Sequence, residues 1–320
     1  MRAPVLVLLA CGVTCLALLL GACARPSGPT TSSLTGLPLG NGGDGPVLAV
    51  KIDNARAARP WTGLDAADVV YVEPVEGGST RLLALFASRR PASVGPVRSF
   101  RESDLDVLAA YGRPGLVYSG AAPELAGALA AAAVVPLSPA QVPDAFRRDP
   151  DRSAPDNLYA DPAALAARAG EAGGATSAST TGAGFTFGAA PAGGSPDAEE
   201  RVELGSTRVG SRWDAGAGRW SMSFDGRPAT TRDGTTLQAA TVLVQSVRTT
   251  DTAVSDAAGR VSPKVETVGE GAARVLRDGA VFDARWSRPS PDAGTTVTRA
   301  DGSPLPFAAG PLWVLLVPSG

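Results

Sequence analysis

The N-terminal segment decides how much of this chain can belong to a folded domain. Arg2 precedes an unbroken apolar stretch at residues 5–20. As a helix, this stretch would span about 24 Å at ~1.5 Å per residue. That is short of the ~20 residues that a membrane span usually needs, and it suits the apolar core of a signal peptide. We therefore expect residues 1–22 to be a signal peptide and the folded protein to lie beyond them.

The apolar stretch ends in Leu20-Gly21-Ala22-Cys23. This sequence resembles the bacterial lipobox, whose cysteine receives the lipid and becomes the new N-terminus. The alternatives are an uncleaved anchor helix and a signal without lipidation. Length, position and motif together favour lipidation of Cys23, with a fatty acyl group such as palmitate. Such a protein would be held by its lipid on the extracytoplasmic face of the cell membrane.

Two residue types that carry much enzyme chemistry are missing from the mature chain. Cys11 and Cys15 lie in the segment that would be removed, and the third cysteine is Cys23. The sequence contains no histidine. Ser-His-Asp triads, Cys-His pairs and His-ligated metal sites are therefore excluded. Any catalysis must use carboxylates, Lys, Arg, Tyr or hydroxyl groups, and we expect neither a metal site nor a cofactor.

The charge of the chain argues against a nucleic-acid partner. The formal net charge is −2, and no block of basic residues occurs. Almost all positive charge is arginine, with Lys51 and Lys264 the only lysines. A GC-rich genome accounts for this bias, so the arginine content by itself does not indicate a function.

Two stretches of small and polar residues divide the chain. Residues 23–45 are rich in Pro, Gly, Ser and Thr, and we expect a disordered tether there. Residues 171–200 are rich in Gly, Ala and Ser, and we expect a linker. The sequence thus predicts two domains, at residues 46–170 and 201–320.

Strand and helix signals alternate in residues 46–170. Strands are expected at residues 47–53, 69–75, 80–88, 116–120 and 134–138, and helices at 99–112, 123–133 and 161–170. The helix at 99–112 would begin with a capping box of Ser99 and Glu102 and end at Gly112. Asp161 would cap the last helix. This half is predicted to be α/β with a mixed sheet.

Residues 201–320 lack a helical period and contain short alternating or apolar runs. Asp278-Gly279 and Asp301-Gly302 provide tight turns. We expect a mainly β domain, either a sandwich or a curled sheet. The fold class of the whole chain is therefore α+β.

Four polar clusters in the first half are candidates for a binding site. They follow the strand at 47–53, form the turn at 73–81, precede the helix at 99–112, and occupy the loop at 147–159. The candidate ligand-binding residues are Asp53, Asn54, Arg59, Glu73, Glu76, Gly77, Gly78, Arg81, Arg98, Ser99, Arg101, Arg152 and Asn157.

An anion site is the sharpest hypothesis among these clusters. Gly95 leads into a helix N-terminus, where free N–H groups and Arg98 and Arg101 could hold a phosphate or carboxylate. The alternative is an ordinary capped helix with solvated arginines. Glu73 lies on an otherwise apolar strand and would need a partner, for which Arg81 is the nearest candidate. Two alternatives apply to the segment at residues 73–81. It could be a solvated hairpin turn, or Glu73 and Glu76 could act as general acid and base.

Several segments together resemble a known family. They are KIDN, GLDAADVVYVEPVEGGSTRLLALF, SVGPVRSFR, FRRDPDRSAPDNLY, TVGEGAARVLRDGAVFDARWSRPS and PLWVLLVP. In this order they resemble the YerB-like bacterial lipoproteins, a family named for unknown function, over nearly all of residues 46–318. The resemblance implies an envelope-anchored protein of two domains and no established reaction. The family often has histidine where this chain has Ala55, Asp156 and Ala229 or one of its neighbours.

These features favour binding over catalysis. The leading hypothesis is a lipid-tethered, non-enzymatic module that binds an anionic or glycan ligand of the cell envelope. One alternative is a histidine-free hydrolase or transferase of envelope polymers that uses carboxylates. Another is a scaffold whose β domain docks an envelope protein, although the sequence identifies no protein partner.

Overall fold

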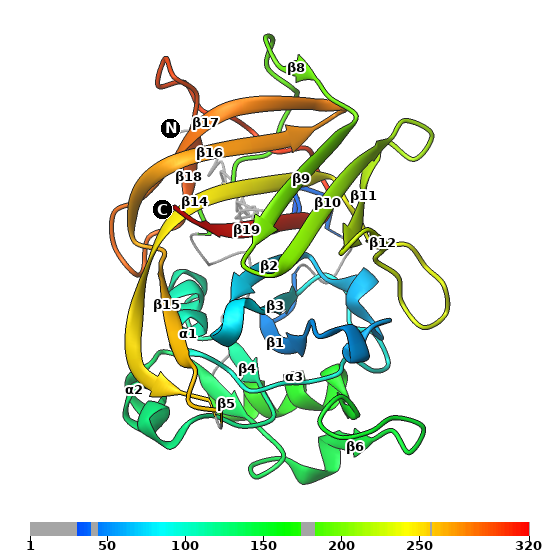
Figure 1. Ribbon diagram of the computed structural model, residues 1–320, viewed down its shortest axis with the longest axis vertical. Coiled ribbons are helices and arrows are strands. Elements are labelled where there is room, and N and C mark those ends of the chain that lie inside the picture. Colours follow the sequence, from blue (N-terminus) through cyan, green and yellow to red (C-terminus); the bar gives the residue numbers. More distant parts are fainter. Residues whose placement is uncertain (1–30, 40–43, 174–182, 257, 320) are drawn as a thin grey trace, which may run out of the picture.

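The computed structural model describes residues 31–39, 44–173, 183–256 and 258–319 (Figure 1). The strands of the N-terminal part are β1 (Leu48–Asp53), β2 (Val69–Pro74), β3 (Thr80–Phe86), β4 (Gly115–Val117), β5 (Val135–Leu137), β6 (Phe146–Arg148) and β7 (Leu158–Ala160). The α-helices of the described residues are α1 (Glu102–Leu108), α2 (Ala126–Ala131) and α3 (Pro162–Glu171). Short 3-10 helices lie at Arg56–Ala58, Leu64–Ala66, Glu76–Gly78, Ala109–Tyr111, Pro123–Leu125 and Pro143–Ala145.

The C-terminal part of the described chain is built from strands. They are β8 (Ser195–Pro196), β9 (Glu199–Leu204), β10 (Thr207–Asp214), β11 (Arg219–Phe224), β12 (Arg227–Pro228), β13 (Gln238–Ala239), β14 (Thr241–Ser255), β15 (Val261–Glu266), β16 (Gly269–Arg277), β17 (Ala280–Arg288), β18 (Thr296–Thr298) and β19 (Leu312–Pro318). The predicted fold class is confirmed, with α/β structure followed by mainly β structure.

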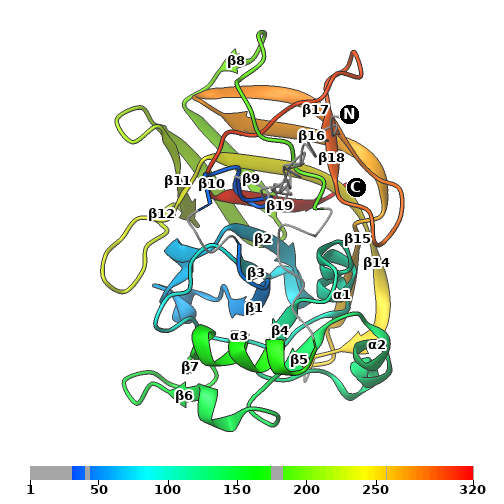
Figure 2. The same ribbon diagram turned by 180° about the vertical axis from the view of Figure 1, so that it is seen from behind.

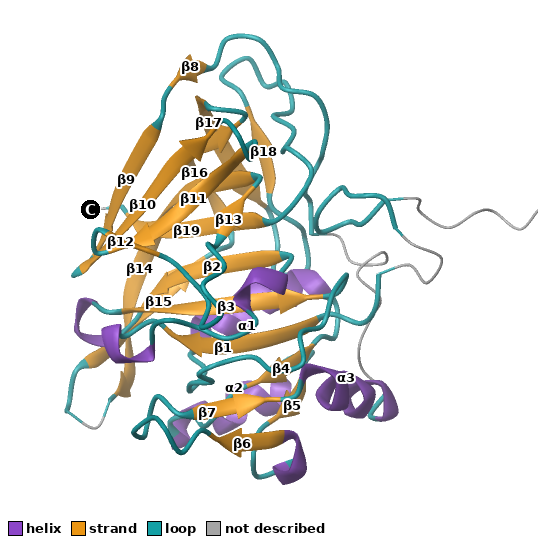
Figure 3. Ribbon diagram, turned by 90° about the vertical axis from the view of Figure 1, so that its right-hand side faces the viewer, coloured by secondary structure: helices purple, strands orange, loops and turns teal. Residues whose placement is uncertain are grey.

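One mixed sheet of twelve strands runs through both parts of the described chain. Its order is β18-β17-β16-β14-β19-β2-β3-β1-β4-β5, with β15 paired to β14 and β8 paired to β17. Figure 3 shows the sheet extending from β17 near the top, through β2, β3 and β1, to β5 nearer the bottom. β19 lies between β14 and β2 and pairs with both in parallel. The two parts on either side of the predicted linker therefore both contribute strands to one sheet.

Both faces of the large sheet are covered, which explains why its central strands are buried on both sides. On β1, Leu48, Val50 and Ile52 face one hydrophobic core and Ala49 faces the other, as the alternation predicted. The first core also receives α3 and a second, five-stranded sheet of β12-β11-β10-β9 with β13. The second core receives α1 and part of α2. Figure 2 shows α3 lying across the β4–β5 end of the large sheet.

The predicted tether at residues 23–45 extends too far into the folded protein. Leu34 is fully buried in the second core. The carbonyl of Thr35 accepts a hydrogen bond from the Gly310 amide at 2.7 Å. The described residues 31–39 thus form part of the fold, because an apolar side chain anchors them. Cys23 and the signal peptide lie outside the described residues.

The predicted linker at residues 171–200 also includes folded residues. Phe185 and Phe187 pack on Phe307, with ring centroids 5.6 and 6.2 Å apart. β8 pairs with β17, and β9 begins at Glu199. Aromatic residues in a small-residue background were the signal that Phe185 and Phe187 pack against the folded protein.

The caps of two helices show where local sequence rules succeed and fail. The Asp161 carboxylate accepts hydrogen bonds from Ala163 N and Ala164 N, at 2.9 and 3.1 Å, as predicted. The prediction of a capping box formed by Ser99 and Glu102 is wrong. α1 begins at Glu102, and Asp104 accepts the hydrogen bond of the Arg101 amide at 2.6 Å. The helix therefore starts later than predicted, because Asp104 provides the cap.

Candidate functional site

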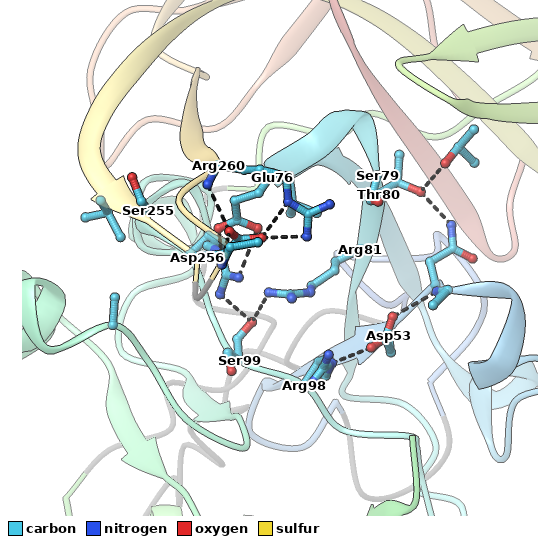
Figure 4. Close-up of a pocket in the computed structure, with 18 of the residues that line it drawn as sticks. Asp53, Glu76, Ser79, Thr80, Arg81, Arg98, Ser99, Ser255, Asp256 and Arg260 are labelled. Carbon is cyan, nitrogen blue, oxygen red and sulfur yellow. Dashed lines mark hydrogen bonds and ion pairs between the residues drawn. The ribbon is translucent and has the colours of Figure 1, made fainter. Parts of the chain in front are cut away.

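A cleft of about 1030 Å³ lies where the two parts of the protein meet (Figure 4). The N-terminal part contributes the end of β1, the β2–β3 turn and the loop before α1. Eight predicted site residues line it: Asp53, Asn54, Arg59, Glu76, Arg81, Arg98, Ser99 and Arg101. The sequence thus correctly identified residues that the fold brings together, although their role in binding is a separate question.

Charged groups dominate the lining of the cleft. Its arginines are Arg56, Arg59, Arg81, Arg98, Arg101 and Arg260, and its carboxylates are Asp53, Glu76, Glu124, Asp225 and Asp256. None of the lining residues is aromatic. Most of the arginines are already paired, so the cleft's chemistry depends on which of them keep free donors.

Arg101 is saturated by its surroundings. Its Nε and Nη2 bind the two oxygens of Glu76, the Nη2 contact measuring 3.0 Å. Its Nη1 donates to the carbonyl of Phe100 at 2.9 Å. Burial alone would raise the pKa of Glu76, but the hydrogen bonds and charge of Arg101 outweigh it and lower that pKa. Arg101 therefore fixes Glu76 and the start of α1 and has little donor capacity left for a ligand.

Arg98 is held at one edge only. Its Nε donates to Asp53 Oδ2, and its side chain is 27% exposed. The other oxygen of Asp53 accepts a hydrogen bond from the Ala55 amide at 2.8 Å. Neither Nη group of Arg98 makes a hydrogen bond to described residues. Asp53 therefore orients Arg98 through Nε, and the two Nη groups can donate to a ligand.

Arg81 has no acidic partner among the described residues. Its Nη1 donates to the carbonyl of Ser99 at 3.1 Å, while Nε and Nη2 donate to no described group. These two donors form the edge that binds an oxyanion in a bidentate manner. Burial and the neighbouring charge of Arg101 lower the pKa of Arg81 to about 10. Figure 4 shows its guanidinium inside the cleft, with Ser99 and Arg98 close by.

Glu73 does not belong to the cleft, and its predicted partner is wrong. The register places Glu73 opposite Arg81, but its Oε2 accepts a hydrogen bond from Lys51 Nζ at 2.5 Å. Lys51 Nζ also donates to Asp104 Oδ1 at 2.7 Å. All three side chains of this buried triad are at most 1% exposed. The other oxygen of Glu73, Oε1, has no hydrogen-bond partner among the described residues.

The triad places two carboxylates around a single ammonium group. Burial, followed by the charge of Asp104, raises the pKa of Glu73 from 4.5 to about 8. A folded-state pKa above the unfolded value favours folding when the group is protonated. This contribution is complete below about pH 4.5 and is lost as the pH rises through about 8.

We expect Glu73→Gln to remove most of this pH dependence. Glutamine keeps a carbonyl acceptor for Lys51 and leaves one cation opposite one anion, Asp104. The variant should therefore be about 1–4 kcal/mol more stable than the wild type at about pH 9, with little difference at about pH 5. Urea unfolding across this range measures the effect. Parallel stability curves for the two proteins would contradict the raised pKa.

The remaining predicted residues lie near the cleft but do not line it. Asn157 organises the preceding loop, because it accepts from Arg148 at 2.7 Å and donates to the carbonyl of Arg152 at 3.2 Å. Arg152 in turn donates to the carbonyls of Ala58 and Pro60, both at 2.9 Å. These two residues support the segment that carries Arg59.

Gly77 and Gly78 form the contact between the β2–β3 turn and the C-terminal part. Both have positive φ angles, of 66° and 71°. The carbonyl of Gly78 accepts a hydrogen bond from the Ser206 amide at 2.7 Å. A Cβ on Gly205 would lie only 2.4 Å from that carbonyl oxygen. Gly78 and Gly205 therefore permit close approach of two backbones, and a Cβ on Gly77 would lie 2.6 Å from the Arg260 side chain. Neither Gly77 nor Gly78 is among the residues that line the cleft.

The sequence analysis missed the C-terminal wall of the cleft. This wall consists of Ser206, Thr207, Asp225, Val254, Ser255, Asp256, Ala258 and Arg260. The residues occupy hairpin turns and the end of β14, where polar side chains are ordinary. Thr80 links the two sides, since its hydroxyl accepts from Asn54 at 2.7 Å and donates to Thr207 at 3.2 Å. The pairing of β19 with β2 helps to bring the two parts into this arrangement.

Comparisons with known proteins identify the family. The N-terminal domain of the family "Protein of unknown function (DUF3048)" matches residues 34–175, and the C-terminal domain matches residues 201–314. "Putative lipoprotein YerB" of Bacillus subtilis (strain 168) is 29% identical over 279 residues, which are 85% of this chain and 81% of YerB. The crystal structure of YerB from Bacillus subtilis has the same fold, with a TM-score of 0.75 at 24% identity, covering 91% of this chain and 97% of YerB. The chain belongs to the DUF3048 family of proteins of unknown function.

Proposed function

We propose that this protein is a membrane-anchored lipoprotein whose cleft binds an anionic ligand of the cell envelope without catalysing a reaction. The observation that carries this proposal is the free Nε–Nη2 edge of Arg81 inside the cleft. A partly buried guanidinium without a carboxylate loses hydration and gains no ion pair in return. An oxyanion on that edge would supply the missing charge and two hydrogen bonds.

The surroundings of Arg81 support recognition of an anion. Asp53 fixes Arg98 and Glu76 fixes Arg101, and neither carboxylate accepts a hydrogen bond from Arg81. Ser79 and Ser99 add hydroxyl groups to the lining. A site whose charged groups are held in place before the ligand arrives loses less conformational entropy on binding.

Carboxylate-based catalysis is not favoured by this geometry. A general acid at neutral pH needs a raised pKa, whereas the pKa of Glu76 is lowered. Glu73 has a raised pKa but is enclosed in the buried triad. Neither glutamate thus combines access to the cleft with the protonation behaviour that acid catalysis requires.

Anchoring through Cys23 rests on the lipobox and on similarity to a protein named as a putative lipoprotein. No helix of the described residues is long and apolar enough to cross a membrane. A lipid on Cys23 would hold the cleft at the extracytoplasmic face of the cell membrane. Labelling with a fatty-acid analogue tests this point, because Cys23→Ser should take up no label.

Calorimetric titration with phosphate tests the binding function. We expect phosphate to bind at constant ionic strength and to raise the melting temperature, since a ligand at 100 times its Kd stabilises by about 2.7 kcal/mol. Chloride at the same ionic strength should have no comparable effect. Equal melting temperatures in phosphate and chloride, together with no heat of binding, would contradict an anion site.

A further inference from the structure

A second, smaller pocket adjoins the cleft. It has a volume of about 180 Å³ and shares Arg56, Arg59 and Asp225 with the cleft. Its floor includes Trp61 and Phe224, and Arg227 lies at its edge. Because the two cavities have a common wall, a ligand long enough to cross that wall would occupy both.

Arg59 forms this wall and is held rigidly. Its Nη1 donates to Asp225 at 2.8 Å, its Nη2 to the carbonyl of Asn54 at 2.7 Å, and its Nε to the Asn54 side chain at 3.1 Å. The guanidinium carbon lies 4.9 Å from the ring centroid of Phe224 and 5.8 Å from that of Trp61. Arg59 therefore covers both rings, which are at most 1% exposed and cannot stack against a neutral sugar.

On the other side of Arg59, further arginines line the second pocket. Arg227 is exposed and makes no hydrogen bond or ion pair with described residues through its side chain. Arg56 is 80% exposed on the rim that both cavities share, 3.6 Å from Asp225. Arg81 in the cleft and Arg227 in the second pocket thus have no acidic partner among the described residues, and Arg56 adds an exposed guanidinium, paired with Asp225, on the rim.

We propose that the ligand is a linear polyanion that crosses the Arg59 wall. One anionic group would bind Arg81 in the cleft, and a following group would bind Arg227 in the second pocket. The inference rests on the proposed function and specifies its ligand class. A cleft of about 1030 Å³ has the size that accommodates a drug-sized ligand or a polymer segment, far more than a single ion.

Chain-length dependence of binding tests this inference. The probes are glycerol phosphate, an oligo(glycerol phosphate), galacturonate, an oligogalacturonate and a neutral dextran oligomer, titrated at constant ionic strength. We expect at least one anionic oligomer to bind about tenfold more tightly than its own monomer, because the second contact becomes intramolecular. The two anionic oligomers distinguish phosphate from carboxylate as the repeated group.

Two arginine variants locate the second contact. Arg227→Gln should remove the advantage of the oligomer over the monomer. Arg147→Gln removes the same charge from an exposed position that lines neither cavity, and it should preserve the advantage. Equal effects of the two substitutions would contradict the proposal of a polyanionic ligand. A neutral oligomer that binds as tightly as an anionic one would also contradict it.

The outcomes also separate this inference from the proposed function. If the monomer binds through Arg81 but the oligomer binds no more tightly, the proposed anion site is supported and the proposal of a polyanionic ligand is wrong. If neither anionic monomer nor oligomer binds, the anion site itself is wrong.

Discussion

Lys51→Met is expected to lower the free energy of unfolding by about 3–5 kcal/mol at neutral pH. Lys51 is fully buried and donates to both Glu73 and Asp104. Methionine fills a similar volume but supplies neither charge nor donors. The substitution would leave Glu73 and Asp104 buried without the ammonium group that contacts both, and removing one partner of a buried ion pair has a large cost.

Urea unfolding of Lys51→Met and of Lys264→Met provides a matched comparison. Lys264 is the other lysine of the chain, and its partly exposed side chain pairs with Glu102 at 2.6 Å. Its replacement should cost at most about 1 kcal/mol, because exposed ion pairs contribute little. Equal stability of the two variants would show that the buried triad does not stabilise the fold.

Arg81→Met is expected to weaken anion binding by about 2–4 kcal/mol, which is about 30- to 1,000-fold in Kd. The variant loses the free Nε–Nη2 edge and keeps an apolar side chain of similar length. Its stability should equal or exceed that of the wild type, because the buried guanidinium has no acidic partner among the described residues. A purely structural role of Arg81 predicts the reverse pattern.

Arg101→Met is the control for Arg81→Met. Arg101 is saturated by Glu76 and by backbone carbonyls, so its removal should lower stability by leaving Glu76 without its cation. Measuring phosphate affinity and urea stability for both variants gives two independent readouts. Wild-type affinity in Arg81→Met would contradict the site.

Local sequence rules predicted the elements whose stability is local. The two-faced burial of β1, the β2–β3 hairpin and the Asp161 cap of α3 follow from alternation, turn residues and capping chemistry. The predicted start of α1 was wrong because two acidic residues, Glu102 and Asp104, compete for the cap. Asp104 provides it, and its side chain also binds the buried Lys51. A local pattern does not contain that tertiary contact.

Long-range partners were harder to predict. Glu73 was correctly identified as a carboxylate that needs a partner, and the register does place Arg81 opposite it. The choice between Arg81 and Lys51 depends on which side chain α1 encloses, and this is decided by packing. Arg81 is consequently left without an acidic partner among the described residues, which is the feature that defines the candidate site.

The C-terminal half of the cleft could not be inferred from its own sequence. Ser206 and Arg260 lie in or beside turns that resemble any exposed hairpin. They reach the cleft because β19 inserts beside β2 and joins the two parts in one sheet. The order of strands from distant segments depends on the whole fold, so the sequence of a single hairpin does not predict it.

Anomalous diffraction from crystals of the wild-type protein soaked in selenate tests the central claim most directly. Selenate has the tetrahedral shape and charge of sulfate, and its selenium can be located without reference to the protein. The account predicts a peak in the cleft with selenate oxygens at hydrogen-bond distance, about 2.7–2.9 Å, from Nε and Nη2 of Arg81. Selenate bound elsewhere on the protein, with the edge of Arg81 unoccupied, would contradict it.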